Sequence, residues 1–233
     1  MKKATCVIRL GPCLVPEAGQ FDQLIAAAGD LNSVQCYDAP AGEALPDPDR
    51  VHCAVLTGSA AMVTDHHPWS ELAAEWTQRY LELERPLLGI CYGHQLIAYA
   101  LGAPVGKNPA GREIGTIEVK LSPAAQHDPV FGNLPKQLRV HSSHLESVLA
   151  LPPGAELLGS SARDAHQVVR FAPCAWGVQF HPEFTAQVMR GYIDQRSAAV
   201  RDEGGDPQAL RDAVASTNDG PQLLRAFFAY ADR

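Results

Sequence analysis

The sequence lacks several features that mark whole classes of proteins. None of its 6 cysteines forms a C-x-x-C pair, which argues against a zinc ribbon or a thioredoxin-like motif. No apolar run approaches the roughly 18–20 residues that a membrane-spanning helix needs. Basic residues number 19 against 26 acidic ones, a net charge of −7 that disfavours gripping nucleic-acid backbones. We therefore expect a cytoplasmic protein with mostly free thiols that binds neither nucleic acid nor membranes.

The rest of the composition is that of a globular protein: 233 residues, 46% of them hydrophobic and 19% charged. In the first hundred residues, segments typical of strands alternate with segments typical of helices. Strands are expected at 4–10, 33–37, 51–56 and 86–90, and helices at 17–28, 68–83 and 94–101. This alternation predicts a mainly parallel α/β sheet. In the helix at 68–83, the stripe of Leu72, Trp76 and Tyr80 is expected to face the core.

After Gly115 the pattern changes to short strands separated by turns. They are expected at 116–121, 138–141, 156–158, 167–171 and 176–180, and they predict an antiparallel layer that leads back to the sheet. Residues 185–233 are expected to form helices broken at 204–207 and 218–221. We expect one domain, 1–233, with a three-layer α/β core at 1–184 and a C-terminal helical extension at 185–233.

The strongest local motif is GICYG at residues 89–93, which follows an apolar strand and precedes a helix. It has the form of a nucleophile elbow with Cys91 in place of serine. Such an elbow needs glycines because a β-carbon beside the strained turn would clash. It also places the sulfur at a helix N-terminus, with the Tyr92 N–H aimed where an oxyanion would form. The alternative is that Cys91 is a small core residue, and the motif alone leaves this open.

A thiol nucleophile needs a base, and His181 is the best placed of the 9 histidines. It follows the expected strand 176–180, so it can face the crevice at the edge of the sheet. Glu183, two residues later, can hold the second ring nitrogen and fix the tautomer. Alternatively, His-Pro-Glu is a polar turn that opens the helix at Thr185.

Taken together, GICYGHQ at 89–95 and GVQFHPEF at 177–184 resemble the class I (triad) glutamine amidotransferases. The resemblance is closest to the glutaminase part of GMP synthases and its stand-alone relatives. It implies the family's three-layer, flavodoxin-like sandwich with the nucleophile at the carboxyl edge of the sheet. It covers residues 50–184 well and the N-terminal strands more loosely.

The resemblance also implies a role for each matching residue. Cys91 would attack the side-chain amide of glutamine and form a γ-glutamyl thioester, releasing ammonia. His181 would shuttle the proton and Glu183 would orient it. The N–H groups of Tyr92 and Ser59 would form the oxyanion hole, although this loop reads Gly58-Ser59-Ala60 where members usually carry two glycines and often a proline.

Five residues would meet the substrate by the same resemblance: Gly58, Gln95, Ser143, His144 and Leu145. Here Leu145 and Glu146 replace the Gly and Asp of the family's S-H-G-D segment. His141, His144 and Glu146 could also suggest a metal site, but the segment is expected to be a strand followed by a loop. We therefore expect no metal and no cofactor.

Three functions are compatible with these residues. The first is a glutaminase subunit that feeds ammonia to a separate synthase, since the sequence contains neither S-G-G-x-D-S nor G-x-x-x-x-G-K-[ST]. The second is a stand-alone hydrolase of another γ-glutamyl compound, and the third is a non-enzymatic binding relative. The presence of all three residues of the expected triad argues against the third. The oligomeric state is left open.

Overall fold

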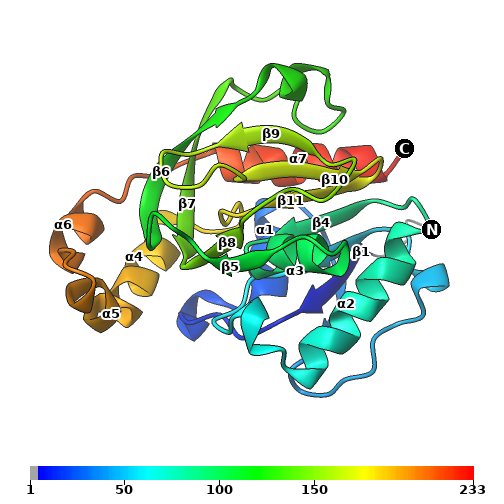
Figure 1. Cartoon of the computed structure of the whole chain (residues 1–233), viewed down its shortest axis with the longest axis horizontal. Coiled ribbons are helices and arrows are strands. Elements are labelled where there is room, and N and C mark those ends of the chain that lie inside the picture. Colours follow the sequence, from blue (N-terminus) through cyan, green and yellow to red (C-terminus); the bar gives the residue numbers. More distant parts are fainter. Residues whose placement is uncertain (1–4) are drawn as a thin grey trace.

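The computed structural model describes residues 5–233 and is built around one nine-stranded sheet (Figure 1). Ala4, at the start of the first expected strand, lies outside these residues. The strand order is β2-β1-β3-β4-β11-β10-β9-β6-β7. The strands are β1 (Thr5–Arg9), β2 (Val34–Asp38), β3 (Ala54–Leu56), β4 (Leu87–Ile90), β6 (Glu113–Leu121), β7 (Gln137–His144), β9 (Glu156–Ser160), β10 (Val168–Ala172) and β11 (Ala175–Val178).

The first five strands in this order, β2 to β11, are parallel and form the middle layer of three. Their buried residues point alternately to two hydrophobic cores. In β1, Val7 faces the core under α1 (Phe21–Ala28), whereas Ile8 faces the core under α2 (Pro68–Leu81) and α3 (Tyr92–Ala100). The expected α/β fold with a parallel central sheet is confirmed, and it brings the carboxyl ends of β3, β4 and β11 to one edge.

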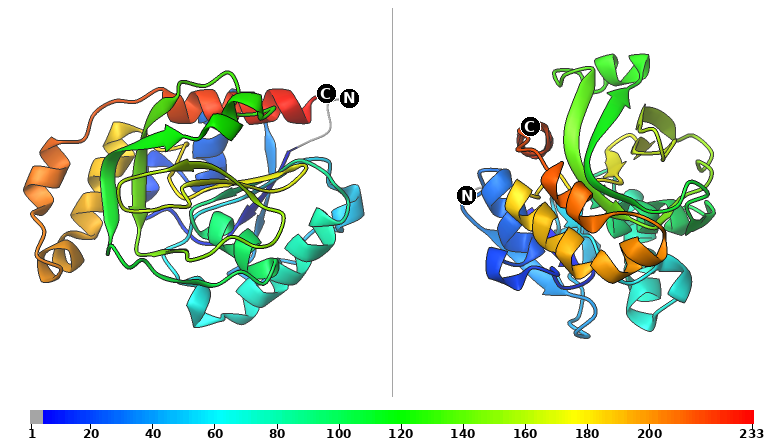
Figure 2. Two further views of the ribbon diagram at one scale, coloured as in Figure 1. Left: turned by 45° about the horizontal axis from the view of Figure 1, so that its top comes forward. Right: turned by 90° about the vertical axis from the view of Figure 1, so that its left-hand side faces the viewer.

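The later strands extend the same sheet instead of forming a layer of their own. From β11 onward every pairing is antiparallel, ending in the long β6–β7 hairpin (Figure 2). Two short strands were not expected from the sequence, β5 (Val105–Lys107) and β8 (Glu146–Val148), which form a separate antiparallel pair. The expected loop at Glu146 is therefore wrong, because this residue begins β8.

The C-terminal helices are α4 (Ala186–Gln195), α5 (Ser197–Asp202), α6 (Pro207–Asp212) and α7 (Asp219–Ala231). The break at 204–207 is present, and the one expected at 218–221 lies a few residues earlier, at 213–218. Asn218 instead caps α7, and Gly220 and Pro221 lie in its first turn, where proline is tolerated. The apolar face of α7 belongs to the core that also holds α1 and α4, so this helix covers one face of the sheet (Figure 1).

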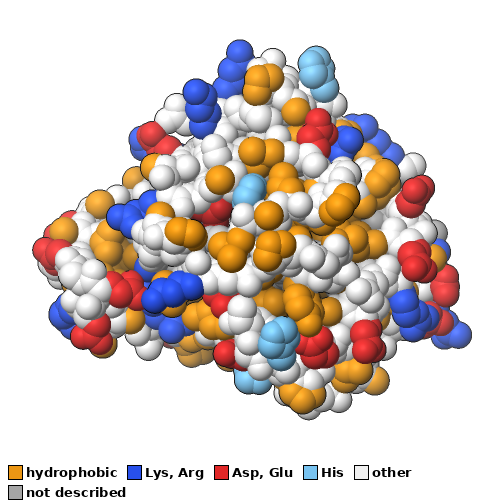
Figure 3. All heavy atoms as spheres, in the orientation of Figure 1, with side chains coloured by type: hydrophobic (Ala, Val, Ile, Leu, Met, Phe, Trp, Pro, Cys, Tyr) orange, Lys and Arg blue, Asp and Glu red, His pale blue; other side chains and the backbone are white. Residues whose placement is uncertain are grey.

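The stripe on α2 is only partly buried. Trp76 and Tyr80 stack on each other in the core, but Leu72 is 62% exposed, so its expected burial is wrong. Among residues 5–233, no helix has the length and apolar character to cross a bilayer. Acidic and basic side chains are interspersed over the face shown in Figure 3, with no continuous basic stripe.

Candidate active site

Cys91 lies at the sharp turn between β4 and α3, as the motif predicts. Its backbone has φ +52° and ψ −101°, a conformation that costs a non-glycine residue free energy. Its N–H donates to the carbonyl of Val178 at 2.8 Å, which ties the turn to the end of β11. Because α3 begins at Tyr92, the N–H of that residue is one of the first-turn donors that a helix leaves unpaired.

Both elbow glycines are required by close backbone contacts. A β-carbon on Gly89 would lie 2.5 Å from the carbonyl oxygen of Gly93. A β-carbon on Gly93 would collide with the backbone of Leu56 at the end of β3. The turn can therefore be this tight only with glycine at both positions, which is the physical reason for the motif.

His181 and Glu183 meet beside Cys91. The Nδ1 atom of His181 lies 2.7 Å from Oε1 of Glu183, and both side chains are buried. The imidazole is a hydrogen-bonding partner of the Cys91 side chain. The His181 N–H donates to the carbonyl of His141 in β7 at 2.7 Å, which fixes the backbone that carries the ring. The structure thus brings together the three residues expected to form the triad.

The imidazole of His181 is also fixed by packing. It stacks on Phe184 with ring centroids 4.0 Å apart and on Phe21 at 5.9 Å. On another side lies Gly58, where a β-carbon would be 2.6 Å from Cε1 of His181. Gly58 therefore contacts the imidazole of His181 instead of lining the pocket next to Cys91.

The charges around His181 favour its protonated form. Burial alone lowers the pKa of the imidazole, but the Glu183 carboxylate and the Cys91 sulfur outweigh burial and raise that pKa to about 10. Nearby His141 behaves oppositely: burial, and then the positive charges of His181 and Arg190, lower its pKa to about 4. At neutral pH His181 is therefore charged and His141 is neutral.

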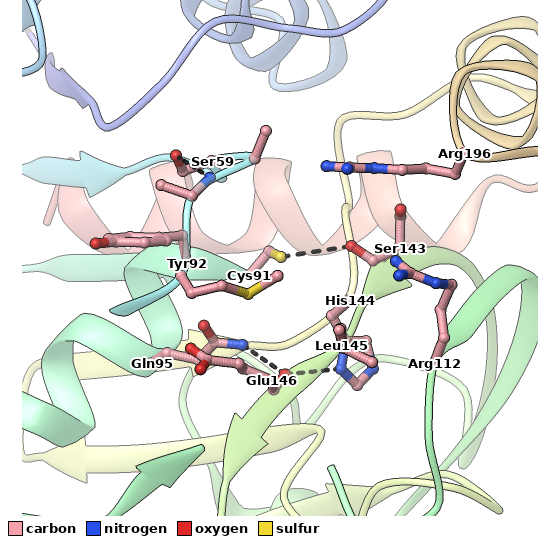
Figure 4. A pocket seen from close by; sticks show the side chains of 13 residues that line it. Ser59, Cys91, Tyr92, Gln95, Arg112, Ser143, His144, Leu145, Glu146 and Arg196 are labelled. Carbon is pink, nitrogen blue, oxygen red and sulfur yellow. Dashed lines mark hydrogen bonds between the residues drawn. The ribbon is translucent and has the colours of Figure 1, made fainter. Parts of the chain in front are cut away.

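A small cavity of about 30 Å³ opens in front of Cys91 (Figure 4). The thiol points across it and is 3.9 Å from the carbonyl oxygen of Ser143. The cavity is lined by Ser59, Ala60, Ala61, Met62, Cys91, Tyr92, Gln95, Arg112, Ser143, His144, Leu145, Glu146 and Arg196. Four of the five residues expected to bind substrate thus line it, and Gly58 does not.

The loop after β3 carries Ser59 and is held in place by side-chain acceptors. The Ser59 hydroxyl accepts from the N–H of Ala61 at 3.1 Å. The Glu146 carboxylate accepts from the N–H of Val63 at 3.0 Å and from the Thr64 hydroxyl. Ser59 and Glu146, two departures from the family pattern, therefore both help to fix this loop.

Gln95 and His144 make contacts that the motifs did not indicate. The side-chain amide of Gln95 donates to the backbone carbonyl of Glu146 at 2.7 Å and to Gln179 at 3.0 Å. The two ring nitrogens of His144 face the same Glu146 carbonyl and the Glu113 carboxylate, at 2.9 and 3.1 Å. In the structure Gln95 thus connects α3 to β8, and His144 connects the same Glu146 carbonyl to β6 (Figure 4).

Among the pocket residues that were not foreseen, two carry a positive charge: Arg112, which precedes β6, and Arg196, which lies between α4 and α5. Neither belongs to a recognisable motif, because each reaches the site only through the tertiary fold. The only signal in the sequence is that arginines commonly bind carboxylates, and this does not select these two among the others.

Comparisons with known proteins identify the family of this domain. Residues 33–197 match the family described as glutamine amidotransferase class-I. The GMP synthase [glutamine-hydrolyzing] of Aeropyrum pernix is 34% identical over 179 residues, which are 74% of this chain but only 33% of that protein. Gamma-glutamyl peptidase 5 of Arabidopsis thaliana is 27% identical over 151 residues, 64% of this chain and 60% of that protein.

Among solved structures, a glutamine amidotransferase from Thermotoga maritima superposes with a TM-score of 0.80. The match covers 100% of both chains at 23% sequence identity, and it supports the fold alone. The chain spans about a third of the length of the GMP synthase that it matches.

Proposed function

The chain belongs to the class I glutamine amidotransferases, and we propose that it hydrolyses the side-chain amide of glutamine to glutamate and ammonia, with Cys91 as the nucleophile. The observation that carries this proposal is the contact of His181 with both Cys91 and Glu183 at a strained elbow. The array has the geometry of a nucleophile, a base and an orienting carboxylate.

The charge state of His181 indicates how the reaction would begin. With its pKa raised to about 10, the imidazole is protonated at neutral pH and stabilises a negative charge on the Cys91 sulfur. Attack of this sulfur on the γ-carbonyl carbon forms a C–S bond and a tetrahedral oxyanion. The N–H groups of Tyr92 and Ser59 would donate to that oxyanion.

Collapse of the tetrahedral intermediate breaks the C–N bond. Protonated His181 gives its proton to the leaving nitrogen, so ammonia departs and the γ-glutamyl thioester remains on Cys91. Neutral His181 then takes a proton from water, whose oxygen attacks the thioester carbon. Glutamate leaves, and the sulfur and the imidazolium are restored. Glu183 stabilises the charged imidazole throughout.

We further propose that the ammonia serves a separate synthase. This is supported by the similarity to a protein named as a glutamine-hydrolysing GMP synthase. A second candidate is hydrolysis of another γ-glutamyl compound by the same thioester chemistry. The similarity to a γ-glutamyl peptidase and the Leu145 replacement in the pocket favour this alternative.

The deciding experiment measures ammonia and glutamate released from glutamine and from a panel of γ-glutamyl dipeptides. Ammonia and glutamate released from glutamine in equal amounts support the first candidate. Glutamate released from dipeptides, with little from glutamine, supports the second. Cys91→Ser is the control, and we expect it to lower turnover at least ~10³-fold without changing the fold.

Labelling provides a readout that does not depend on turnover. A glutamine-like diazoketone should modify Cys91, because this is the thiol that lines the pocket. Burial raises the pKa of Cys6 and of Cys53 to about 12 and that of Cys36 to about 11. Mass spectrometry that finds the label on one of these thiols and not on Cys91 would contradict the proposed nucleophile.

A further inference from the structure

Opposite Cys91, the pocket ends on an arginine that no carboxylate neutralises. Within residues 5–233, no acidic side chain forms an ion pair with Arg196. The other arginine of the pocket, Arg112, makes two hydrogen bonds of 3.0 Å to Glu203. Glu146, the one acidic residue among those that line the pocket, directs its carboxylate to the N–H of Val63 and not to Arg196. Among the described residues, Arg196 is therefore a pocket cation without an ion-pair partner.

The backbone of Arg196 is fixed, so its side chain starts from a defined point. The residue ends α4 and caps α5. Its N–H donates to the carbonyl of Tyr192 at 3.0 Å, and its own carbonyl accepts from Val200 at 2.9 Å. Figure 4 shows its guanidinium extending toward the space between Ser59 and Ser143, across from Cys91. Arg196 is thus a half-buried cation directed into the cavity from the helical side.

We propose that Arg196 binds the α-carboxylate of the substrate's glutamyl group, an inference that rests on the proposed function. Glutamine and every γ-glutamyl compound carry this carboxylate at the end remote from the scissile γ-carbonyl. With that carbonyl at Cys91, the carboxylate lies toward the far side of the cavity. A guanidinium offers two parallel N–H donors that match the two oxygens of a carboxylate.

The size of the cavity gives Arg196 a second task. About 30 Å³ accommodates one or two water molecules, so a glutamyl group enters only when side chains at the mouth move. Arg196 has a long, flexible side chain and no ion pair that would have to break. It can turn outward as the substrate enters and return when the carboxylate is in place. Since this contact is made equally in the ground state and the transition state, it affects KM more than kcat.

The test compares two substrates in two variants. L-Glutamine and L-glutaminamide differ only in the α-substituent, which is a charged carboxylate in the first and a neutral carboxamide in the second. We expect Arg196→Met to lower kcat/KM for glutamine by about 10- to 100-fold, mostly through KM, because a charged hydrogen-bonded pair is lost. For glutaminamide, the same substitution should change kcat/KM by no more than about twofold. Arg201→Met is the matched control, an exposed arginine of α5, the helix that Arg196 caps, and should change neither.

Three results would overturn the assignment. An equal loss of kcat/KM for glutamine and glutaminamide would mean that Arg196 supports the structure of the pocket and does not bind the α-carboxylate. A loss seen with γ-glutamylglycine, but not with its C-terminal amide or with glutamine, would mean that Arg196 binds a distal carboxylate. Unchanged kinetics for both substrates would mean that it contacts no part of them.

Labelling separates this inference from the proposed function. If the protein turns over none of the substrates, the proposed function fails. The rate of Cys91 alkylation by a glutamine-like diazoketone then tests Arg196 alone. We expect Arg196→Met to slow the reagent that carries the α-carboxylate and not its α-amide. Equal rates for the two reagents in the unmodified protein would overturn the inference.

Discussion

Gly58→Ala tests how closely the loop after β3 and the imidazole of His181 depend on each other. The new β-carbon would lie 2.6 Å from Cε1 of His181, whereas ordinary van der Waals contact begins at 3.4 Å. The difference, 3.4 less 2.6, requires a displacement of about 0.8 Å. The imidazole cannot easily supply it, because Phe184 stacks on its face and Glu183 holds Nδ1 at 2.7 Å.

Two displacements are therefore possible, and both affect the same reaction. Either the ring of His181 turns away from Cys91, or the loop moves and takes the Ser59 N–H with it. A displacement near 1 Å in a catalytic array costs up to about 10²-fold in rate. Overpacking of a filled site costs about 1–3 kcal/mol of unfolding free energy. We expect kcat to fall by about 10- to 100-fold and KM to change little, since Gly58 does not line the cavity.

Steady-state kinetics with glutamine or the preferred γ-glutamyl substrate measures this effect, and urea unfolding measures the stability. Gly106→Ala in β5 is the matched control, because its β-carbon would lie 3.2 Å from a single side-chain atom of Leu149. That variant should retain kcat within about twofold. A Gly58→Ala protein with unchanged kcat would refute the reasoning, because 0.8 Å would then have been absorbed without cost to the array.

Three further predictions concern the supports of the site. Glu146→Gln should lower the unfolding free energy by about 1–3 kcal/mol and reduce kcat, because it removes the carboxylate that accepts hydrogen bonds from the Val63 N–H and the Thr64 hydroxyl. An unchanged melting temperature and unchanged kinetics would contradict this. The pKa of His181 is raised to about 10. The contribution of the protonated imidazole to the free energy of unfolding is therefore complete below about pH 6.5 and is lost as the pH rises through 10. Between pH 6.5 and 10, the free energy of unfolding in urea should therefore fall more steeply with pH in the unmodified protein than in Glu183→Gln. Equal slopes for the two proteins would argue against an ion pair between His181 and Glu183. Truncation after residue 204 should prevent folding, as judged by circular dichroism, because it removes the four large buried side chains of α7, each worth about 1.5–3 kcal/mol; a folded truncated protein would show that α7 is dispensable.

Much of the fold follows from local sequence patterns. The parallel strands and their helices have strong hydrophobic periodicity, so β1, β3, β4, α2 and α3 lie within a few residues of their expected places. The elbow is predictable for a different reason. A strained turn between a strand and a helix requires glycines at a fixed spacing, and the motif GICYG at residues 89–93 has that spacing. The pairing of His181 with Glu183 follows from their separation by only two residues.

The antiparallel half of the molecule, from β5 to β10, was harder to predict, because short strands gain their stability from neighbours that are distant in the chain. Nothing in VGK or ESV signals that β5 and β8 pair across about 40 residues. Leu72 has the helical spacing of a core residue, but the sequence could not reveal that its side of α2 faces solvent. Arg112 and Arg196 reach the pocket only through the placement of β6 and of the α4–α5 turn.

The antiparallel half nevertheless determines the geometry of the candidate site. β11 is the last parallel strand and the first to have an antiparallel neighbour, and the chain leaves it toward His181. The backbone of His181 is then held by the carbonyl of His141 in β7, the same strand that supplies Ser143 opposite the thiol. A shift of β7 therefore moves His181 and the far wall of the cavity together. Since Cys91 is fixed separately by β3, β4 and Val178, such a shift changes the distance between the nucleophile and its base without disturbing the elbow.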